Sequence, residues 1–99
     1  MTARSTPPVK RGWPPINSDP RRVRPPYDVD DRTFDHLRRT DTDTWRVAIH
    51  LDRVAALGEP LDGLPVSDYE HRVLEWAAGL DVSTVAVLAA LLHRTRAAS

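Results

Sequence analysis

Histidines and carboxylates are the residues of this chain whose types and spacing could support acid–base or metal chemistry. The four histidines are His36, His50, His71 and His93, and His71 stands four residues before Glu75. Residues at that spacing share a helix face, but a zinc site needs three or four converging ligands, and no H-E-x-x-H motif is present. The sequence also lacks G-x-S-x-G, P-loop and dinucleotide-binding motifs. We therefore expect no catalytic residue, no metal site, no cofactor, no small-molecule substrate and no enzymatic activity.

Basic residues and prolines gather in the first 26 residues. This arm holds six basic side chains, one acidic side chain and seven of the nine prolines. Each proline fixes φ, removes an N–H donor and disfavours helix in the residue before it. The large apolar residues of the arm, such as Trp13 and Val23, are too few to form a core. We therefore expect residues 1–26 to be extended or disordered, followed by a single helical domain over 27–99.

The side chains of the arm support three interpretations. Its cations suit phosphate groups, and its prolines with aromatic residues suit an aromatic-lined groove on a protein partner. A solubilising leader that binds nothing is the third. If the arm binds a partner, the contact residues are expected to be Lys10, Arg11, Trp13, Arg21, Arg22, Arg24 and Tyr27.

Helix signals divide the rest of the chain into four segments, at about 29–39, 44–57, 67–79 and 83–97. Asp28 and Asp43 are the expected N-caps of the first two, and Gly58 followed by Pro60 ends the second. Ser67 and Glu70 have the spacing of a capping box. No segment alternates apolar and polar residues as a strand does. The fold class is therefore expected to be all-α, a small bundle of three or four helices.

Apolar residues at helical spacing predict which faces form the core. In segment 44–57 they form a stripe about 120° wide, and segment 67–79 carries a similar set. A left-handed Gly79 is expected to end the latter segment. The stripe residues are Val47, Ala48, Leu51, Val54 and Ala55 in the first segment and Tyr69, Val73, Trp76, Ala77 and Leu80 in the second.

The last helix is expected to be apolar around nearly its whole circumference. Residues 85–92 are all Val, Ala or Leu, and one neighbouring helix cannot cover such a surface. A core of about 70 residues rarely supplies more than about 3–5 kcal/mol, which favours added stability from association. We expect a partner-binding or oligomer-forming face that comprises Trp45, Val85, Leu88, Leu91 and Leu92.

Residues 66–97 resemble the opening of a LuxR-type or sigma-factor helix-turn-helix unit. The matching residues are Ser67, Glu70, Val73, Leu74, Ala78, Gly79, Leu80, Val85, Ala86 and Leu88. The resemblance implies a DNA-binding helical hairpin, whereas the expected last helix has no polar face before His93. In this alternative the nucleic-acid contacts are Arg21, Arg22, Arg24, Arg94 and Arg96.

Composition excludes several classes of protein. The chain has no cysteine, which rules out disulfides, Cys-ligated metals and thiol catalysis. Its longest apolar run, Val85 to Leu92, is far shorter than the ~20 residues of a membrane span, and its first residues lack the apolar core of a secretory signal. We therefore expect a cytoplasmic protein without membrane contact. The favoured function is a small helical adaptor that binds a protein partner or a second copy, with the nucleic-acid-binding regulator as the alternative.

Overall fold

The structure is a computed structural model that describes residues 12–98, and within them it contains four α-helices, one short 3-10 helix and no strand. The α-helices are α2 (Asp35–Thr40), α3 (Thr42–Gly58), α4 (Asp68–Ala78) and α5 (Val82–Ala98). The 3-10 helix η2 (Glu59–Leu61) continues directly from α3. The expectation of an all-α fold is confirmed.

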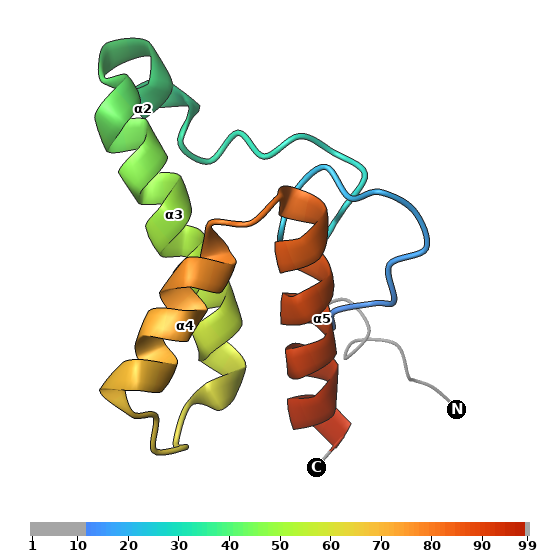
Figure 1. Cartoon of the computed structure of the whole chain (residues 1–99). Coiled ribbons are helices and arrows are strands. Elements are labelled where there is room, and N and C mark those ends of the chain that lie inside the picture. Colours follow the sequence, from blue (N-terminus) through green and yellow to red (C-terminus); the bar gives the residue numbers. More distant parts are fainter. Residues whose placement is uncertain (1–11, 99) are drawn as a thin grey trace.

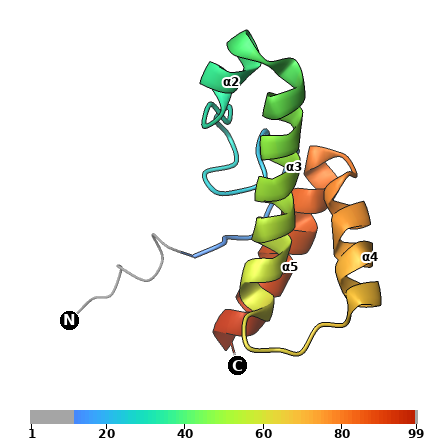
Figure 2. The same cartoon turned by 90° about the vertical axis from the view of Figure 1, so that its left-hand side faces the viewer.

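Helix α3 is the element against which the other helices pack. It contacts α2, α4 and α5 (Figure 1). Seen from the side, α4 and α5 lie against the C-terminal half of α3, and α2 lies at its N-terminal end (Figure 2). None of the helices within residues 12–98 is long and apolar enough to cross a membrane.

Side-chain caps determine where α4 and α5 begin. Ser67 Oγ accepts a hydrogen bond from the Glu70 N–H, and the Glu70 carboxylate accepts one from the Ser67 N–H. The Asp81 carboxylate accepts bonds from both the N–H and the hydroxyl of Thr84. These bonds satisfy N–H groups that the first helical turn leaves unpaired. The predicted capping box is therefore confirmed.

Three local predictions about helix ends are wrong. The N-cap of α3 is Asp41, which accepts bonds from the N–H groups of Asp43 and Thr44, so Asp43 lies in the first turn. Helix α2 begins at Asp35 rather than near 29, because the Asp31 carboxylate accepts the Thr33 N–H and holds a turn there. Gly79 ends α4 with φ of −86°, outside the left-handed region.

Alanine makes up most of the core. Besides Pro20 and Pro60, eight apolar residues of the described chain are buried, and α5 supplies four of these eight. An alanine Cβ lets neighbouring helices approach closely and leaves no room for a bulky side chain at the same place. Only Leu57 and Val85 are large side chains that are fully buried. The eight buried residues other than proline are Val23, Ala56, Leu57, Ala78, Val85, Ala86, Ala89 and Ala90.

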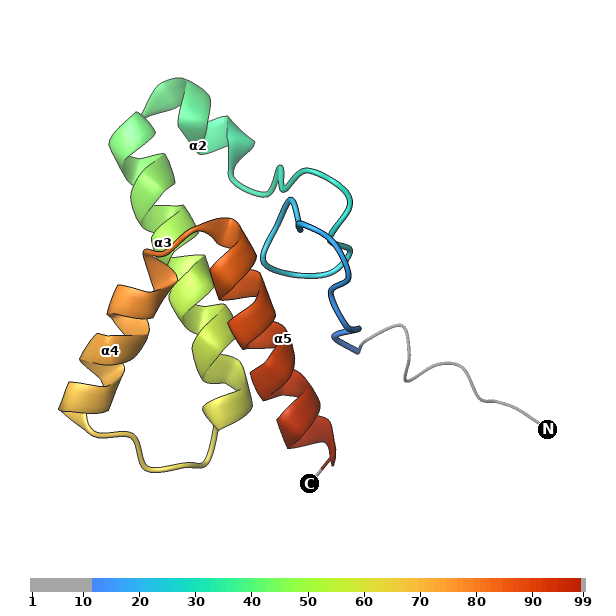
Figure 3. The ribbon, with the colours of Figure 1, turned by 45° about the vertical axis from the view of Figure 1, so that its right-hand side comes forward.

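The segment before α2 covers the side of α5 that the other helices leave open. Residues 12–34 form no helix and pass beside α5 on the side away from α4 (Figure 3). They form no core of their own, but Val23 is buried in the helical core and Trp13 packs against it. The described part of the arm, residues 12–26, therefore forms no helix or strand and packs against the helices. Residues 1–11 of the arm lie outside the described part of the chain.

The apolar stripes predicted for the core are confirmed only in part. Val54, Ala77 and Leu80 pack against the core, whereas most of the bulky stripe residues lie at the surface. Val47 and Leu51 on α3 are exposed, and so are Tyr69, Val73 and Trp76 on α4. Helix α3 instead buries Ala56 and Leu57, and α4 buries Ala78. Around the alanines of α5 the core therefore combines small residues with a few larger ones, such as Leu57 and Leu74.

Replacing Leu57 by alanine is expected to lower the free energy of unfolding by about 2–5 kcal/mol, because a fully buried side chain would leave a cavity. The matched control is Leu51→Ala on the same helix, where the side chain is 58% exposed and the loss is expected to stay below about 1 kcal/mol. Urea denaturation followed by circular dichroism measures both. Equal losses in the two variants would contradict the core described here.

Candidate interaction surfaces

Trp13 and Arg24 fasten the N-terminal segment to α3, η2 and α5. The Trp13 ring stacks on the His93 ring with centroids 3.9 Å apart and planes within 8°. The Arg24 guanidinium donates two hydrogen bonds to the Glu59 carboxylate, at 2.9 and 2.8 Å, and lies 5.9 Å from the Trp13 ring centroid. Arg24 also contacts Asp52 at 3.4 Å. We call Trp13, Arg24, Glu59 and His93 the clasp.

The clasp explains two shifted pKa values. The hydrogen bonds between Arg24 and Glu59 raise the pKa of the guanidinium and lower that of the carboxyl. His93 adds a second link to α3, since its Nε2 lies 3.0 Å from the Ala56 carbonyl oxygen. Trp13 and Arg24, predicted to contact a partner, are therefore engaged within the chain.

The other predicted arm residues also contact the chain itself where the structure describes them. Arg21 forms a 3.0 Å ion pair with Asp30, and Arg22 lies 3.9 Å from Asp31. Tyr27 is half-buried, burial raises the pKa of its phenol, and its hydroxyl has no hydrogen-bond partner. Lys10 and Arg11 lie outside the described residues.

The arginines assigned to nucleic acid in the alternative are likewise occupied. Besides Arg21, Arg22 and Arg24, this applies to both arginines of α5. Arg94 donates to the Trp13 carbonyl oxygen, and Arg96 donates to those of Pro60 and Asp62. These bonds tie the end of α5 to the N-terminal segment and to η2. All five candidate cations thus have a partner within the chain.

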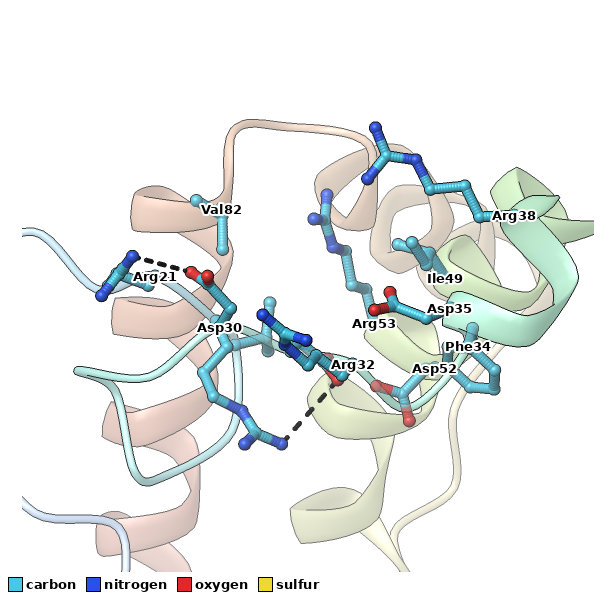
Figure 4. A pocket seen from close by; sticks show the side chains of 13 residues that line it. Arg21, Asp30, Arg32, Phe34, Asp35, Arg38, Ile49, Asp52, Arg53 and Val82 are labelled. Carbon is cyan, nitrogen blue, oxygen red and sulfur yellow. Dashed lines mark ion pairs between the residues drawn. The ribbon is translucent and has the colours of Figure 1, made fainter. Parts of the chain in front are cut away.

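Figure 4 shows a pocket of about 420 Å³ between the loop before α2, helices α2 and α3, and the start of α5. Arginines and aspartates make up most of its lining, and its apolar lining residues are Val23, Phe34, Ile49 and Val82. Its charged lining residues are Arg21, Arg22, Arg32, Arg38 and Arg53 with Asp30, Asp31, Asp35 and Asp52.

The charges of this pocket largely neutralise one another. Burial raises the pKa of Asp31, but the hydrogen bonds from Thr33 and the charges of Arg22 and Arg53 outweigh that effect and lower the pKa. Asp31 therefore stays ionised between the two guanidiniums. The lining contains no Ser, Cys, Lys or His that could act as nucleophile or base. The arrangement holds the loop against the helices.

Helix α4 carries the most exposed aromatic residues of the described chain. Tyr69 is 70% exposed and Trp76 is 67% exposed, and Val73 between them is also exposed. Their spacing of four and then three residues places them on one face of the helix. We call Tyr69, Val73 and Trp76 the α4 surface. Sequence reasoning placed these residues in the core, and only the alanine content of α5 could have argued against that.

A mostly apolar hollow adjoins the α4 surface. It measures about 510 Å³ and shares Val73 with that surface. The loop between η2 and α4 supplies much of its wall, and Leu64 and Val66 in that loop are themselves exposed. The lining residues are Leu61, Leu64, Pro65, Val66, Glu70, Val73 and Leu74.

The outer face of α5 is only partly as expected. Val85 is fully buried, and Leu92 packs against the core, so neither belongs to an exposed face. Leu88 and Leu91 are exposed, the latter by 48%, and Val87 beside them is exposed as well. The helix is thus not enclosed by the rest of the described chain.

The remaining predicted residues have local contacts. Trp45 is half-buried and lies under the Arg38 guanidinium, 5.0 Å from ring centroid to the guanidinium carbon. His71 lies 3.8 Å from Glu75 in an exposed pair. Within residues 12–98 no group of three or more His, Asp or Glu side chains is placed to hold a metal ion.

No protein-family model matches this sequence, and searches of the curated proteins and of the solved structures gave no significant match. Helix α4, a short connection and helix α5 follow one another in the chain, as in the helix-turn-helix unit that residues 66–97 resemble. Helix α5, however, exposes Val87, Leu88 and Leu91 rather than polar residues suited to reading bases.

The clasp is expected to make stability depend on pH. The pKa of the Glu59 carboxyl is lowered in the folded chain. Its contact with Arg24 therefore stabilises the folded state fully at pH values above the ordinary glutamate pKa of about 4.3. This stabilisation is lost as the pH falls through the lowered pKa of the folded chain. Glu59→Gln should flatten the pH dependence of the unfolding free energy between about pH 3 and 5 and cost at most about 1 kcal/mol at pH 7, since the pair is solvent-screened. Denaturant titrations across pH measure this, with exposed Asp62→Asn as the control. A slope unchanged by Glu59→Gln would refute the role given to the clasp.

Proposed function

We propose that this chain is a small non-enzymatic interaction protein that binds a protein partner through the α4 surface. The observation that carries the proposal is the exposure of Tyr69 and Trp76 by more than two thirds. Tyrosine and tryptophan contribute most strongly to protein–protein binding when they become buried. The apolar hollow beside Val73 offers the partner a place for its own apolar side chain.

The magnitudes favour binding of moderate strength. An aromatic side chain presents about 150–250 Å², so covering the exposed parts of both rings contributes roughly 5–8 kcal/mol at about 25 cal/mol per Å². Association itself costs at least about 4 kcal/mol. Burial of the two rings alone therefore leaves little net binding free energy, and contacts with Val73 and the hollow must add to it.

The basic arm has a smaller role in this proposal than the α4 surface. Its described arginines lie in contacts with the chain's own carboxylates, which removes them as free contacts for a partner. Lys10 and Arg11 keep their proposed role as additional contacts for an acidic partner. A cytoplasmic location is part of the proposal, in keeping with the absence of cysteine.

Capture from a lysate of the source cells tests the proposal. The full chain is expected to retain a protein that Tyr69→Ala/Trp76→Ala fails to retain, because the variant removes both exposed rings. The matched control is Glu75→Ala, an exposed residue on another face of the same helix, which should retain it. Circular dichroism verifies that all three chains are folded. Identical retention by the wild type and the double variant would refute the α4 surface as the binding site.

A duplex DNA titration distinguishes the proposal from the nucleic-acid alternative. We expect no binding whose affinity falls steeply with salt, since Arg21, Arg22 and Arg24 are paired with carboxylates and Arg94 and Arg96 with carbonyl groups. Fluorescence anisotropy at about 50 mM salt measures this. Tight binding that weakens steeply with salt, with a slope reduced by Arg21→Ala/Arg22→Ala, would instead establish the alternative.

A further inference from the structure

The outer face of α5 carries a four-residue stripe that is separate from the α4 surface. The stripe consists of Thr84, Leu88, Leu91 and Thr95, spaced by four, three and four residues. Such alternating spacing keeps side chains in line along one helix face and is the spacing by which two helices pair. Leu88, Leu91 and Thr95 are exposed, Thr84 is half-buried, and the exposed Val87 lies beside the stripe.

Charge is absent from most of this helix. No Asp, Glu, Lys or Arg occurs from Val82 to Leu92. The acidic residue Asp81 precedes the helix, and the basic residues Arg94 and Arg96 lie near its end. A partner that covers the stripe must therefore be uncharged along its length.

The stripe is its own complement when a second copy runs in the opposite direction. Read from either end, the order of its residues is Thr, Leu, Leu, Thr with the same spacing. In an antiparallel pair Leu88 of each copy faces Leu91 of the other, and the two threonines face each other at both ends. A two-fold interface requires this kind of self-complementarity.

The helix dipoles favour the antiparallel arrangement over the parallel one. Antiparallel pairing sets the N-terminal end of each α5 beside the C-terminal end of the other, which is the favourable arrangement of two helix dipoles. The Asp81 carboxylate and the Arg94 guanidinium are bonded within their own chain, to Thr84 and to the Trp13 carbonyl oxygen, so the direction of pairing does not depend on them.

From this pattern we infer that two copies of the chain associate through α5, antiparallel, with Leu88 against Leu91. The stripe extends over only about 16 Å of helix, so the dimer is weak and forms at high concentration. The inference goes beyond the proposed function and does not depend on it, because the α4 surface is on another helix and stays available to a different partner.

Sedimentation equilibrium of the full chain over roughly 10 µM to 1 mM tests the inference. The mass of the wild type is expected to rise toward that of a dimer. Leu88→Glu and Leu91→Lys, each alone, should raise the dissociation constant at least about tenfold, because each places two charges against leucines. Leu51→Glu on α3, where the residue is also exposed but lies outside the stripe, should dimerise as the wild type does.

Mixing the two charged variants tests the register. Leu88→Glu and Leu91→Lys together should form a mixed dimer, because antiparallel pairing sets the introduced Glu opposite the introduced Lys and leaves Leu91 opposite Leu88. A mixture of Leu88→Glu and Leu88→Lys should form less of the mixed dimer, since the two substituted positions face each other only in a parallel pair. A wild type that stays monomeric, a dimer that survives Leu88→Glu, or preferential rescue by the second mixture would each overturn the inference. None of these results bears on capture by the α4 surface, so the two proposals fail independently.

Discussion

The close approach of helices around the alanines of α5 is the constraint on which the rest of this fold depends. Ala86, Ala89 and Ala90 are fully buried, and Ala89 belongs to one core cluster with Ala56 and Ala78 of the neighbouring helices. Because a core of this kind has little volume, it accommodates only a few bulky side chains. The chain has more large apolar residues than that core can hold, so Tyr69, Trp76 and others remain in contact with water. Exposed apolar surface is therefore a consequence of how the interior is built.

The N-terminal segment makes this narrow core complete. The helices leave much of the α5 surface uncovered, and Val23 is buried in the core from a stretch of chain without helix. A segment without helical hydrogen bonds needs other attachments, which the stack of Trp13 on His93 and the paired contact of Arg24 with Glu59 provide. The same contacts use up cations that would otherwise be available to an external anion. The residues that fasten the segment, Trp13 and Arg24, are thus among those that the sequence suggested as partner contacts.

Sequence reasoning succeeded where the cause of the structure was local. The capping box of Ser67 and Glu70, the boundaries of α4 and α5, and the exposure of Leu88 and Leu91 follow from neighbouring residues and helical spacing. It failed where the cause was tertiary. Periodicity identifies the bulkiest apolar face of a helix, and on α3 and α4 that face is not the one that packs against alanine. The contact of Trp13 with His93 joins residues far apart in the chain and leaves no local signal.

Two kinds of apolar residue are separated in this fold. Alanines and a few larger residues such as Leu57 and Val85 form the core, and exposed bulky side chains such as Trp76 lie outside it. The free energy of unfolding of Trp76→Ala, from urea denaturation of the full chain, tests this separation most directly. The account predicts a loss of at most about 1 kcal/mol, because two thirds of the ring is already in water. A loss of about 3–5 kcal/mol, the usual cost of truncating a buried tryptophan, would show that the ring belongs to the core and would contradict the account.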